Sequence, residues 1–211
     1  IPSILTAAGT TVAYADVWAA YALYHFLPSG AAFVLLGLVA LATLAAALVH
    51  GPGLAGLGLV GAYITPVLVS SQEPNYWALY IYLAIVTAAA YALARMRMWR
   101  WLAITAACFS LFWMLIGIWL PNQIAPHAFH AVAGFALASA FIVSGFLYGP
   151  EPERGRFDLT SSWILAGYLL GASLLVFAIR HDALAVATLF VLSAATIGVA
   201  WRSEAATPAV A

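Results

Sequence analysis

Charged side chains are scarce in this sequence: Asp, Glu, Lys and Arg together make up 7 % of the 211 residues. Soluble domains carry roughly a quarter of charged residues, so this chain has too little charge to cover a water-exposed surface. Lysine is absent, and the seven arginines balance seven acidic residues. The sequence therefore offers no basic surface for nucleic acid, and nucleic-acid binding is excluded as a function.

Cysteine and reactive motifs are equally scarce. Cys108 is the only cysteine and lies within an apolar run, which excludes an internal disulfide and any metal or iron–sulfur site built from several cysteines. We interpret it as a small packing residue. The sequence contains neither a glycine-rich phosphate loop after a strand nor a nucleophile elbow, so nucleotide hydrolysis and serine chemistry have no support. Enzyme activity stays open, and the sequence favours a protein that is not an enzyme.

Apolar residues, by contrast, make up 66 % of the chain. They form runs about as long as the roughly 20 residues that a helix needs to cross a bilayer, and the alternation typical of outer-membrane barrels is missing. The sequence predicts an all-α fold, a polytopic transmembrane helical bundle with about eight spans in a single domain over residues 1–211. The expected spans are 4–26, 31–49, 53–70, 76–94, 101–120, 128–148, 162–179 and 183–201.

The arginines predict the orientation, because short cytoplasmic loops retain Arg and Lys. If the chain crosses the membrane eight times, six of the seven arginines lie on one side, and Arg180 lies on the other. We expect that side, and both termini, to be cytoplasmic in a bacterial inner membrane. In the loop 149–161 the charges nearly cancel, so we interpret it as a solvated turn, with Thr160 or Ser161 as the N-cap of the next helix. The arginines on the crowded side are Arg95, Arg97, Arg100, Arg154, Arg156 and Arg202.

The segment "RMRMWRW", residues 95–101, alternates arginine with Met and Trp. This pattern is typical of a cytoplasmic anchor whose aromatic rings lie at headgroup level. The alternative is a binding site for an anionic lipid headgroup at Arg95, Arg97 and Arg100.

Small residues recur along the third expected span at intervals of four and three, which keeps them on one helical face. Such a face lets two helices pack closely in lipid. Pro66 removes one amide near the end of this span, and the Thr65 hydroxyl can donate to the carbonyl of Gly61. Either the helix is a bent packing element, or it is broken and lines a cavity, as in transporters. The small residues are Gly51, Ala55, Gly58, Ala62 and Thr65.

The stretches "LGLVGAYITPVLVSS", "NYWALYIYLAIV" and "RMWRWL" resemble a family of predicted bacterial polytopic membrane proteins of unknown function. In that family a Gly-Gly-aromatic-x-Thr-Pro segment precedes a polar turn, a span and an Arg-Trp turn. Ala62 stands here where the pattern has its second glycine. The resemblance covers residues 4–120 and implies a bacterial inner-membrane location, without any catalytic residue. Because members are longer, and because the chain begins Ile1-Pro2, we expect a piece of a longer protein.

Asp16 lies near the middle of the first expected span, where a carboxylate is costly unless it faces the bundle interior or water. No arginine is expected at that depth, so the expected partners of the Asp16 carboxyl are hydroxyl groups such as those of Thr10, Thr11 or Thr65. It is a candidate for ion, proton or solute binding together with Thr65 and Pro66. The alternative is a buried, hydrogen-bonded neutral acid that serves packing.

Histidines gather at the non-cytoplasmic side of the expected topology. His127 and His130 lie three residues apart and would share one helix face, a spacing that also occurs in metal and haem sites. They would form a polar periplasmic mouth, or they are ordinary interfacial residues. No cofactor is expected, and metal or haem at this pair is the less favoured alternative. The cluster comprises His25, Glu73, His127, His130 and His181.

Three functions follow from these patterns. The first is transport-like binding or movement of a small or lipid-linked solute. The alternative is a structural or assembly subunit of a larger membrane complex, or a homo-oligomer, that needs only the lipid bilayer and its protein partners. A membrane enzyme that acts on a lipid-linked substrate through His127, His130 and Glu73 is third.

Overall fold

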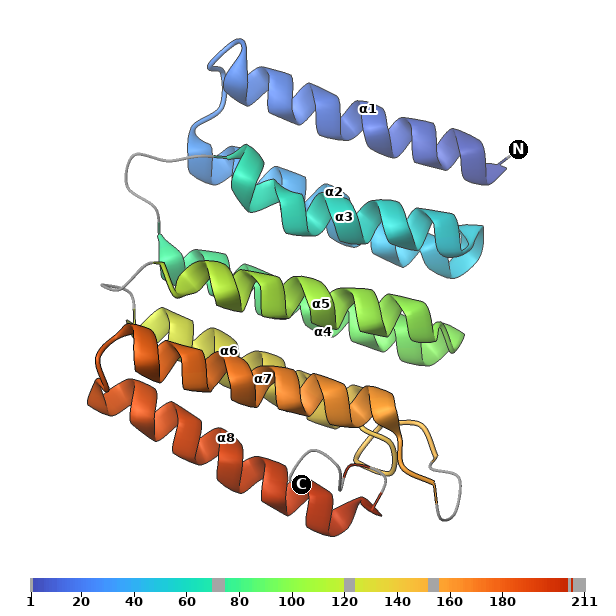
Figure 1. Cartoon of the computed structure of the whole chain (residues 1–211). Helices are drawn as coiled ribbons and strands as arrows, with labels where there is room; N and C mark the ends of the chain where they lie inside the picture. Colours follow the sequence, from blue (N-terminus) through green and yellow to red (C-terminus); the bar gives the residue numbers. More distant parts are fainter. Residues whose placement is uncertain (1, 70–74, 120–123, 152–155, 205, 207–211) are drawn as a thin grey trace. The chain divides into compact units, whose positions relative to one another are not determined.

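The computed structural model describes residues 2–69, 75–119, 124–151, 156–204 and 206. Throughout these residues the regular structure is helical, with eight α-helices, which confirms the all-α prediction. The chain divides into two compact units, Ile1–Asn75 and Tyr76–Ala211 (Figure 1).

Six of the helices found in the described residues are long and apolar enough to cross a membrane: α2 and α4 to α8. The remaining two are α1, which is less apolar, and α3, which has 17 residues. All eight begin and end within a few residues of the expected spans except the sixth. The count of eight crossings stays a prediction.

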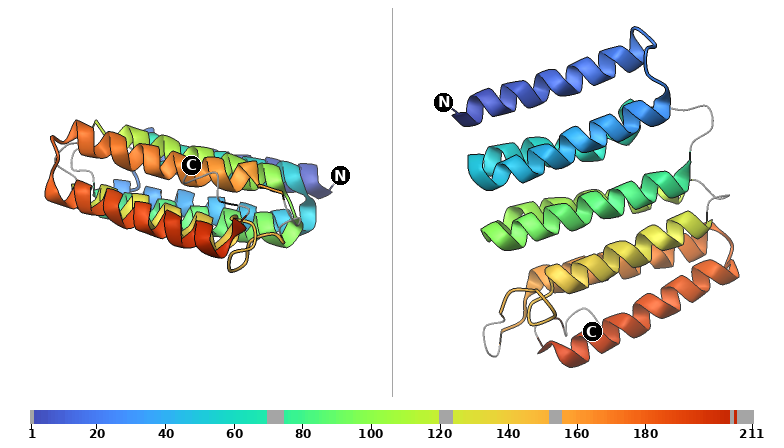
Figure 2. Two further views of the ribbon diagram at one scale, coloured as in Figure 1. Left: turned by 60° about the horizontal axis from the view of Figure 1, so that its bottom comes forward. Right: turned by 180° about the vertical axis from the view of Figure 1, so that it is seen from behind.

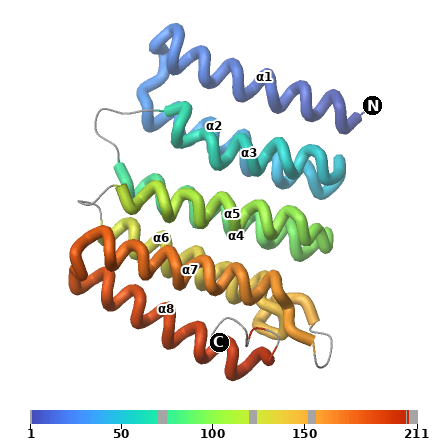
Figure 3. The backbone as a smooth tube through the Cα atoms, in the orientation of Figure 1, coloured from blue at the N-terminus to red at the C-terminus, as the bar shows by residue number. Residues whose placement is uncertain are grey.

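Unit 1 consists of α1 (Pro2–Ala22), α2 (Ser29–His50) and α3 (Pro52–Leu68). The turn between α2 and α3 is a single residue, Gly51, whose φ of +101° favours glycine. The two helices therefore run antiparallel in extensive contact, and α1 lies against both (Figure 3). Gly51 was expected to belong to the small helical face, but its backbone conformation places it in the turn instead.

The small face of α3 packs inside unit 1. Ala55, Ala62 and Thr65 are fully buried, and a Cβ on Gly58 would lie 3.0 Å from the backbone nitrogen of Leu44 in α2. Close helix packing of this kind needs small residues, because apolar contact alone does not hold helices together in lipid. The sequence left open whether this face points inward or outward, and in unit 1 it points at α2.

Unit 2 contains α4 (Tyr76–Arg97), α5 (Arg100–Gly117), α6 (Ile124–Phe141), α7 (Leu159–Ala178) and α8 (Ala183–Arg202). The left view of Figure 2 shows two layers, with α5 and α7 in one and α4, α6 and α8 in the other. Within the unit α6 contacts each of the other four helices. Its side chains therefore form the centre of the unit.

The sixth helix ends at Phe141, seven residues before the end expected at 148. Residues 142–150 fold into a compact turn in which Gly145 donates to the carbonyl of Pro150 and Tyr148 donates to that of Ala140. A Cβ on Gly149 would lie 1.8 Å from the carbonyl oxygen of Val143, so only glycine fits there. This turn replaces the last helical turns that the apolar run predicts.

Enlarging Gly58 should separate α2 from α3. We expect Gly58→Leu to destabilise the protein by about 1–3 kcal/mol, because the added side chain meets the backbone of α2. Gly53→Leu, on the same helix with nothing within 4 Å of the Cβ position, is the matched control. Thermal unfolding of the detergent-purified chain measures both, and equal midpoints for the two variants would contradict the packing role.

Candidate functional site

One end of unit 2 collects the arginines. There α4 ends, α5 begins, α6 ends, α7 begins and α8 ends (Figure 1), and we call it the arginine end. The described arginines at this end are Arg95, Arg97, Arg100, Arg156 and Arg202, while Arg180 follows α7 at the other end. Arg154 falls outside the described residues.

The turn between α4 and α5 positions one cationic and one aromatic side chain, Arg97 and Trp99. The Trp99 amide donates to the carbonyl of Ala94 and the Met98 amide to that of Arg95, with Met98 at a φ of +55°. This pair of hydrogen bonds is a Schellman motif that closes the end of α4. The Arg97 guanidinium then lies 5.3 Å from the ring centre of Trp99, a cation–π distance.

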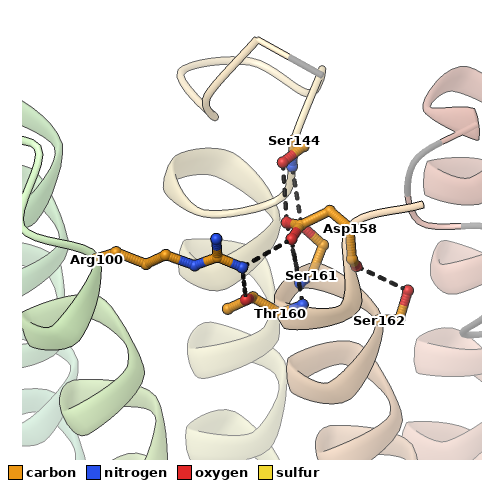
Figure 4. A network of polar contacts seen from close by, with 6 residues as sticks. All are labelled: Arg100, Ser144, Asp158, Thr160, Ser161 and Ser162. Carbon is orange, nitrogen blue, oxygen red and sulfur yellow. Dashed lines mark hydrogen bonds and ion pairs between the residues drawn. The ribbon is translucent and has the colours of Figure 1, made fainter. Parts of the chain in front are cut away.

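Asp158 begins α7 and organises the arginine end (Figure 4). Its carboxylate accepts from the amides of Thr160 and Ser161, both at 3.2 Å. It also accepts from the hydroxyl of Ser144 at 2.9 Å and from that of Ser161. Thr160 or Ser161 was expected as the N-cap, but the structure assigns that role to Asp158, because its acceptor reaches the first free amides of the helix. The sequence "DLTSS" before an apolar run carries this signal.

Arg100 connects α5 to the same cluster. Its guanidinium forms an ion pair with Asp158 at 3.2 Å and donates to the Thr160 hydroxyl. Ser203, just after α8, donates to the carbonyl of Ser144. The start of α5, the α6–α7 connection and the end of α8 are therefore held together by polar contacts.

Asp158 is charged in this setting. Burial raises the pKa of its carboxyl, but the hydrogen bonds from Ser161, Ser144 and Thr160 lower it, and the pKa lies below the ordinary value of 3.8. A carboxylate that accepts several hydrogen bonds stays ionised because each bond favours the charged form.

A cavity of about 580 Å³ opens beside this cluster. Its wall is formed by the end of α4, the start of α5, the end of α6 and the connection that leads into α7. Three arginines and two acidic residues line it together with aromatic and apolar side chains. The ionisable lining residues are Arg95, Arg100, Arg156, Glu151 and Asp158.

The charges in this cavity are not all neutralised. Asp158 is paired with Arg100. Arg95 donates to the sulfur of Met98 at 3.5 Å and has no ion pair with any residue that the structure describes. Arg95 and the aromatic residue Trp99 both line the cavity.

A second group of polar side chains is buried in the interior of unit 2. The Tyr80 hydroxyl lies 3.0 Å from Nδ1 of His127, and the Tyr80 ring stacks on His130 at 4.8 Å. Nε2 of His130 donates to the carbonyl of Ser110 at 3.0 Å, and the Ser110 hydroxyl bonds to that of Tyr168 at 2.9 Å. Two sets of hydrogen bonds, Tyr80–His127 and His130–Ser110–Tyr168, thus lie across α4 to α7, and the stacking of Tyr80 on His130 connects them.

The histidine pair was expected at a polar mouth or as interfacial residues; in the structure each of the two residues is 1 % exposed. The reason is packing on α5: a Cβ on Gly117 would lie 2.0 Å from Nδ1 of His127, so the glycine makes room for the ring. Nε2 of His127 has no partner among the described residues. Those residues contain no group of three or more His, Cys, Asp or Glu side chains that could hold a metal.

The other described members of the expected histidine cluster, His25 and His181, are not buried. His25 follows α1 in unit 1 and is exposed, as is His181 in the turn between α7 and α8. Both residues adopt a positive φ, which marks them as turn positions. Glu73 lies outside the described residues.

In unit 1, Asp16 is exposed on α1. Thr65 is fully buried on α3, and its hydroxyl donates to the carbonyl of Gly61 at 2.8 Å, as predicted. The helix continues through Pro66 to Leu68, so it is not broken at that residue. The role of Asp16, Thr65 and Pro66 in binding an ion, proton or solute stays a prediction.

The sequence did not reveal all the residues that form the buried polar group in unit 2 and the cavity at the arginine end. Tyr80, Ser110 and Tyr168 lie within apolar spans and carry no local motif. Arg156 was counted only for orientation, because nothing in the sequence shows that its loop returns to the end of α4. Only the tertiary packing joins these positions.

Comparison with known proteins assigns the family. The model of the family described as "Predicted membrane protein (DUF2339)" matches residues 1–211, the whole chain. The chain belongs to this family. No curated protein and no solved structure matches. Membership supports a multi-pass membrane protein, in agreement with the six long apolar helices found in the described residues.

The buried hydrogen bond between Tyr80 and His127 should stabilise unit 2. We expect Tyr80→Phe to cost about 1–3 kcal/mol, because it leaves a buried imidazole nitrogen unpaired while it keeps the aromatic ring. Tyr148→Phe removes a hydroxyl from a side chain that is 65 % exposed and is the matched control. Chemical unfolding in detergent measures the change, and equal stability of the two variants would argue against the role.

The Asp158 carboxylate predicts a pH dependence. Because its pKa is lower in the folded protein, its stabilisation is present above the ordinary pKa of 3.8 and is lost as pH falls through the folded value. We expect wild type to exceed Asp158→Asn by about 1–2 kcal/mol at neutral pH, and the difference to shrink below about pH 4. Unfolding of both proteins across this range tests it, and a constant difference would contradict it.

Proposed function

We propose that this membrane protein binds an anionic, phosphate-bearing group in the cavity at the arginine end of unit 2. The observation that carries the proposal is Arg95, a guanidinium in the cavity wall without an ion pair among the described residues. Arg is well suited to this role because its planar fork donates two parallel hydrogen bonds to phosphate oxygens.

The size and lining of the cavity fit such a group. At about 580 Å³ it lies within the usual range for ligand sites, which is roughly 300–1,000 Å³. Three arginines outnumber the two acidic residues in the lining, Asp158 and Glu151, and Arg100 and several hydrogen-bond donors already neutralise Asp158. Trp99 supplies an amphipathic ring that prefers the interface between water and hydrocarbon.

The arginine excess at this end supports a cytoplasmic orientation, since translocated loops lack Arg. The cavity then faces the cytoplasmic surface of the membrane, which is rich in anionic lipids. We therefore place the binding role in a bacterial inner membrane. It is a transport-like function in the limited sense of binding a lipid-linked or small anionic solute.

A structural role in a larger assembly is the second candidate. The small face of α3 no longer supports it, because that face is occupied by α2. What favours it is α1, in which no residue is buried and Asp16 is exposed. A carboxylate on an apolar helix is costly toward lipid, so this face suits contact with another membrane helix.

Substitution of Arg95 tests the binding role. We expect Arg95→Gln to weaken binding of phosphatidylglycerol about fivefold, since one cation near the membrane surface contributes about 1 kcal/mol. Arg202→Gln removes a charge at the same end but outside the cavity lining and is the matched control. Native mass spectrometry of the detergent-purified chain measures bound lipid.

The same spectra separate the two candidates. Retention of anionic lipid by wild type and its selective loss from Arg95→Gln support the binding role. Equal lipid binding by wild type and both variants, together with a fixed mass that includes other subunits, would favour the structural role instead.

A further inference from the structure

An apolar groove runs between α5 and α7. It has a volume of about 350 Å³, and its lining is almost entirely hydrocarbon. Ile104 and Cys108 form one wall on α5, and Trp163 and Ile164 form the other on α7. Because α5 and α7 are both long and apolar enough to span a membrane, the groove lies at hydrocarbon depth.

The groove adjoins the arginine-lined cavity. Leu159 and Thr160, the first residues of α7, line both. Thr160 also receives the hydrogen bond from Arg100, so the polar contacts at the arginine end lie directly above the apolar wall. The arginine-lined cavity and the apolar groove therefore share one boundary.

Two glycines close the groove farther along the helices. A Cβ on Gly167 would lie 2.7 Å from the side chain of Leu111, and one on Gly171 would lie 2.7 Å from the sulfur of Met114. These contacts bring α5 and α7 together below the groove. Between Thr160 and Gly167 the helix rises about 10 Å at 1.5 Å per residue, which sets the depth of the opening.

We propose that the ligand of the arginine-lined cavity is a membrane lipid whose hydrocarbon chain lies in the groove between α5 and α7 while its phosphate-bearing headgroup occupies the cavity. The inference rests on the proposed function and names the source of the anion. A soluble phosphate would use only the polar chamber. A lipid uses both parts, because burial of its methylene groups against Ile104 and Trp163 adds to the contacts of the headgroup.

A protein helix is a poorer occupant of this groove. An α-helix with its side chains is about 10 Å across or more, whereas the groove has a volume of about 350 Å³ and ends where Leu111 meets Gly167. A single hydrocarbon chain fits a short groove of this kind and can continue outward along Trp163, which is 71 % exposed.

Filling the groove tests the inference. Cys108→Phe places a ring in it, and Ala194→Phe places the same ring on an exposed position of α8. The two sites are matched in depth, because each lies eight residues from the arginine at that end, Arg100 or Arg202. Phosphatidylglycerol and inorganic phosphate are titrated into the detergent-purified chain, with native mass spectrometry as the readout.

The expected result is a roughly tenfold weaker binding of phosphatidylglycerol by Cys108→Phe, as follows from the loss of a few buried methylene contacts. Ala194→Phe should bind like wild type, and inorganic phosphate should bind far more weakly than the lipid to all three. Equal lipid binding by both Phe variants would overturn the inference, as would phosphate binding as tightly as the lipid.

A second readout needs no substitution. Cys108 is the only cysteine and a free, exposed thiol, so alkylation by N-ethylmaleimide reports on the groove alone. Phosphatidylglycerol should slow this reaction severalfold and inorganic phosphate should not. No protection by the lipid would contradict the inference even if Cys108→Phe failed to fold.

The two proposals fail in different ways. If Arg95→Gln weakens lipid binding but Cys108→Phe does not, the cavity binds a headgroup and the groove is unoccupied. If neither wild type nor any variant binds the lipid or phosphate, the proposed function itself is wrong.

Discussion

The Asp158 carboxylate is the interaction on which the arginine end of unit 2 depends. It caps α7, accepts the hydroxyl of Ser144 from the α6–α7 connection, and pairs with Arg100 at the start of α5. A membrane protein has few charges with which to make such contacts, and here one acidic group satisfies donors from three segments. The cavity beside it is lined by these segments and by the end of α4. Its charged state, favoured by those donors, keeps Arg100 engaged, whereas Arg95 has no ion pair among the described residues.

In the interior of unit 2, too, polar groups are held by hydrogen bonds between helices. Polar groups within hydrocarbon are costly unless they bond to one another, and Tyr80, His127, His130, Ser110 and Tyr168 do so across four helices. Glycines make this possible: Gly117 admits the His127 ring, and Gly134 admits the hydroxyl end of Tyr168. Small residues thus have several uses in this chain. In unit 1, Gly58 lets the backbones of α2 and α3 approach each other. In unit 2, glycines either make room for polar rings or let α5 and α7 pack together beyond the groove.

How far the sequence predicts the structure differs between helices and sites. The helical class and the approximate ends of seven of the eight helices follow from apolar runs about the length of a bilayer, and the bond from Thr65 to Gly61 follows from local geometry. The turn at 142–150 was not predicted, because Gly145 and Gly149 act through contacts with Pro150 and Val143 that an apolar run does not reveal. The N-cap of α7 was misplaced by two or three residues, although the motif that marks Asp158 is present.

By itself, the sequence determined that this is a helical membrane protein, because low charge and long apolar runs leave no other stable arrangement in water or lipid, and it predicted that all arginines but Arg180 lie at one end. The tertiary structure decided which polar residues meet. It buried His127 and His130, turned the small face of α3 toward α2, left Asp16 exposed on α1, and joined Arg95 to a loop some 60 residues away in the chain. The reason is that helix periodicity fixes which residues share a face, whereas the neighbour of each face depends on shape complementarity between helices that are distant in sequence.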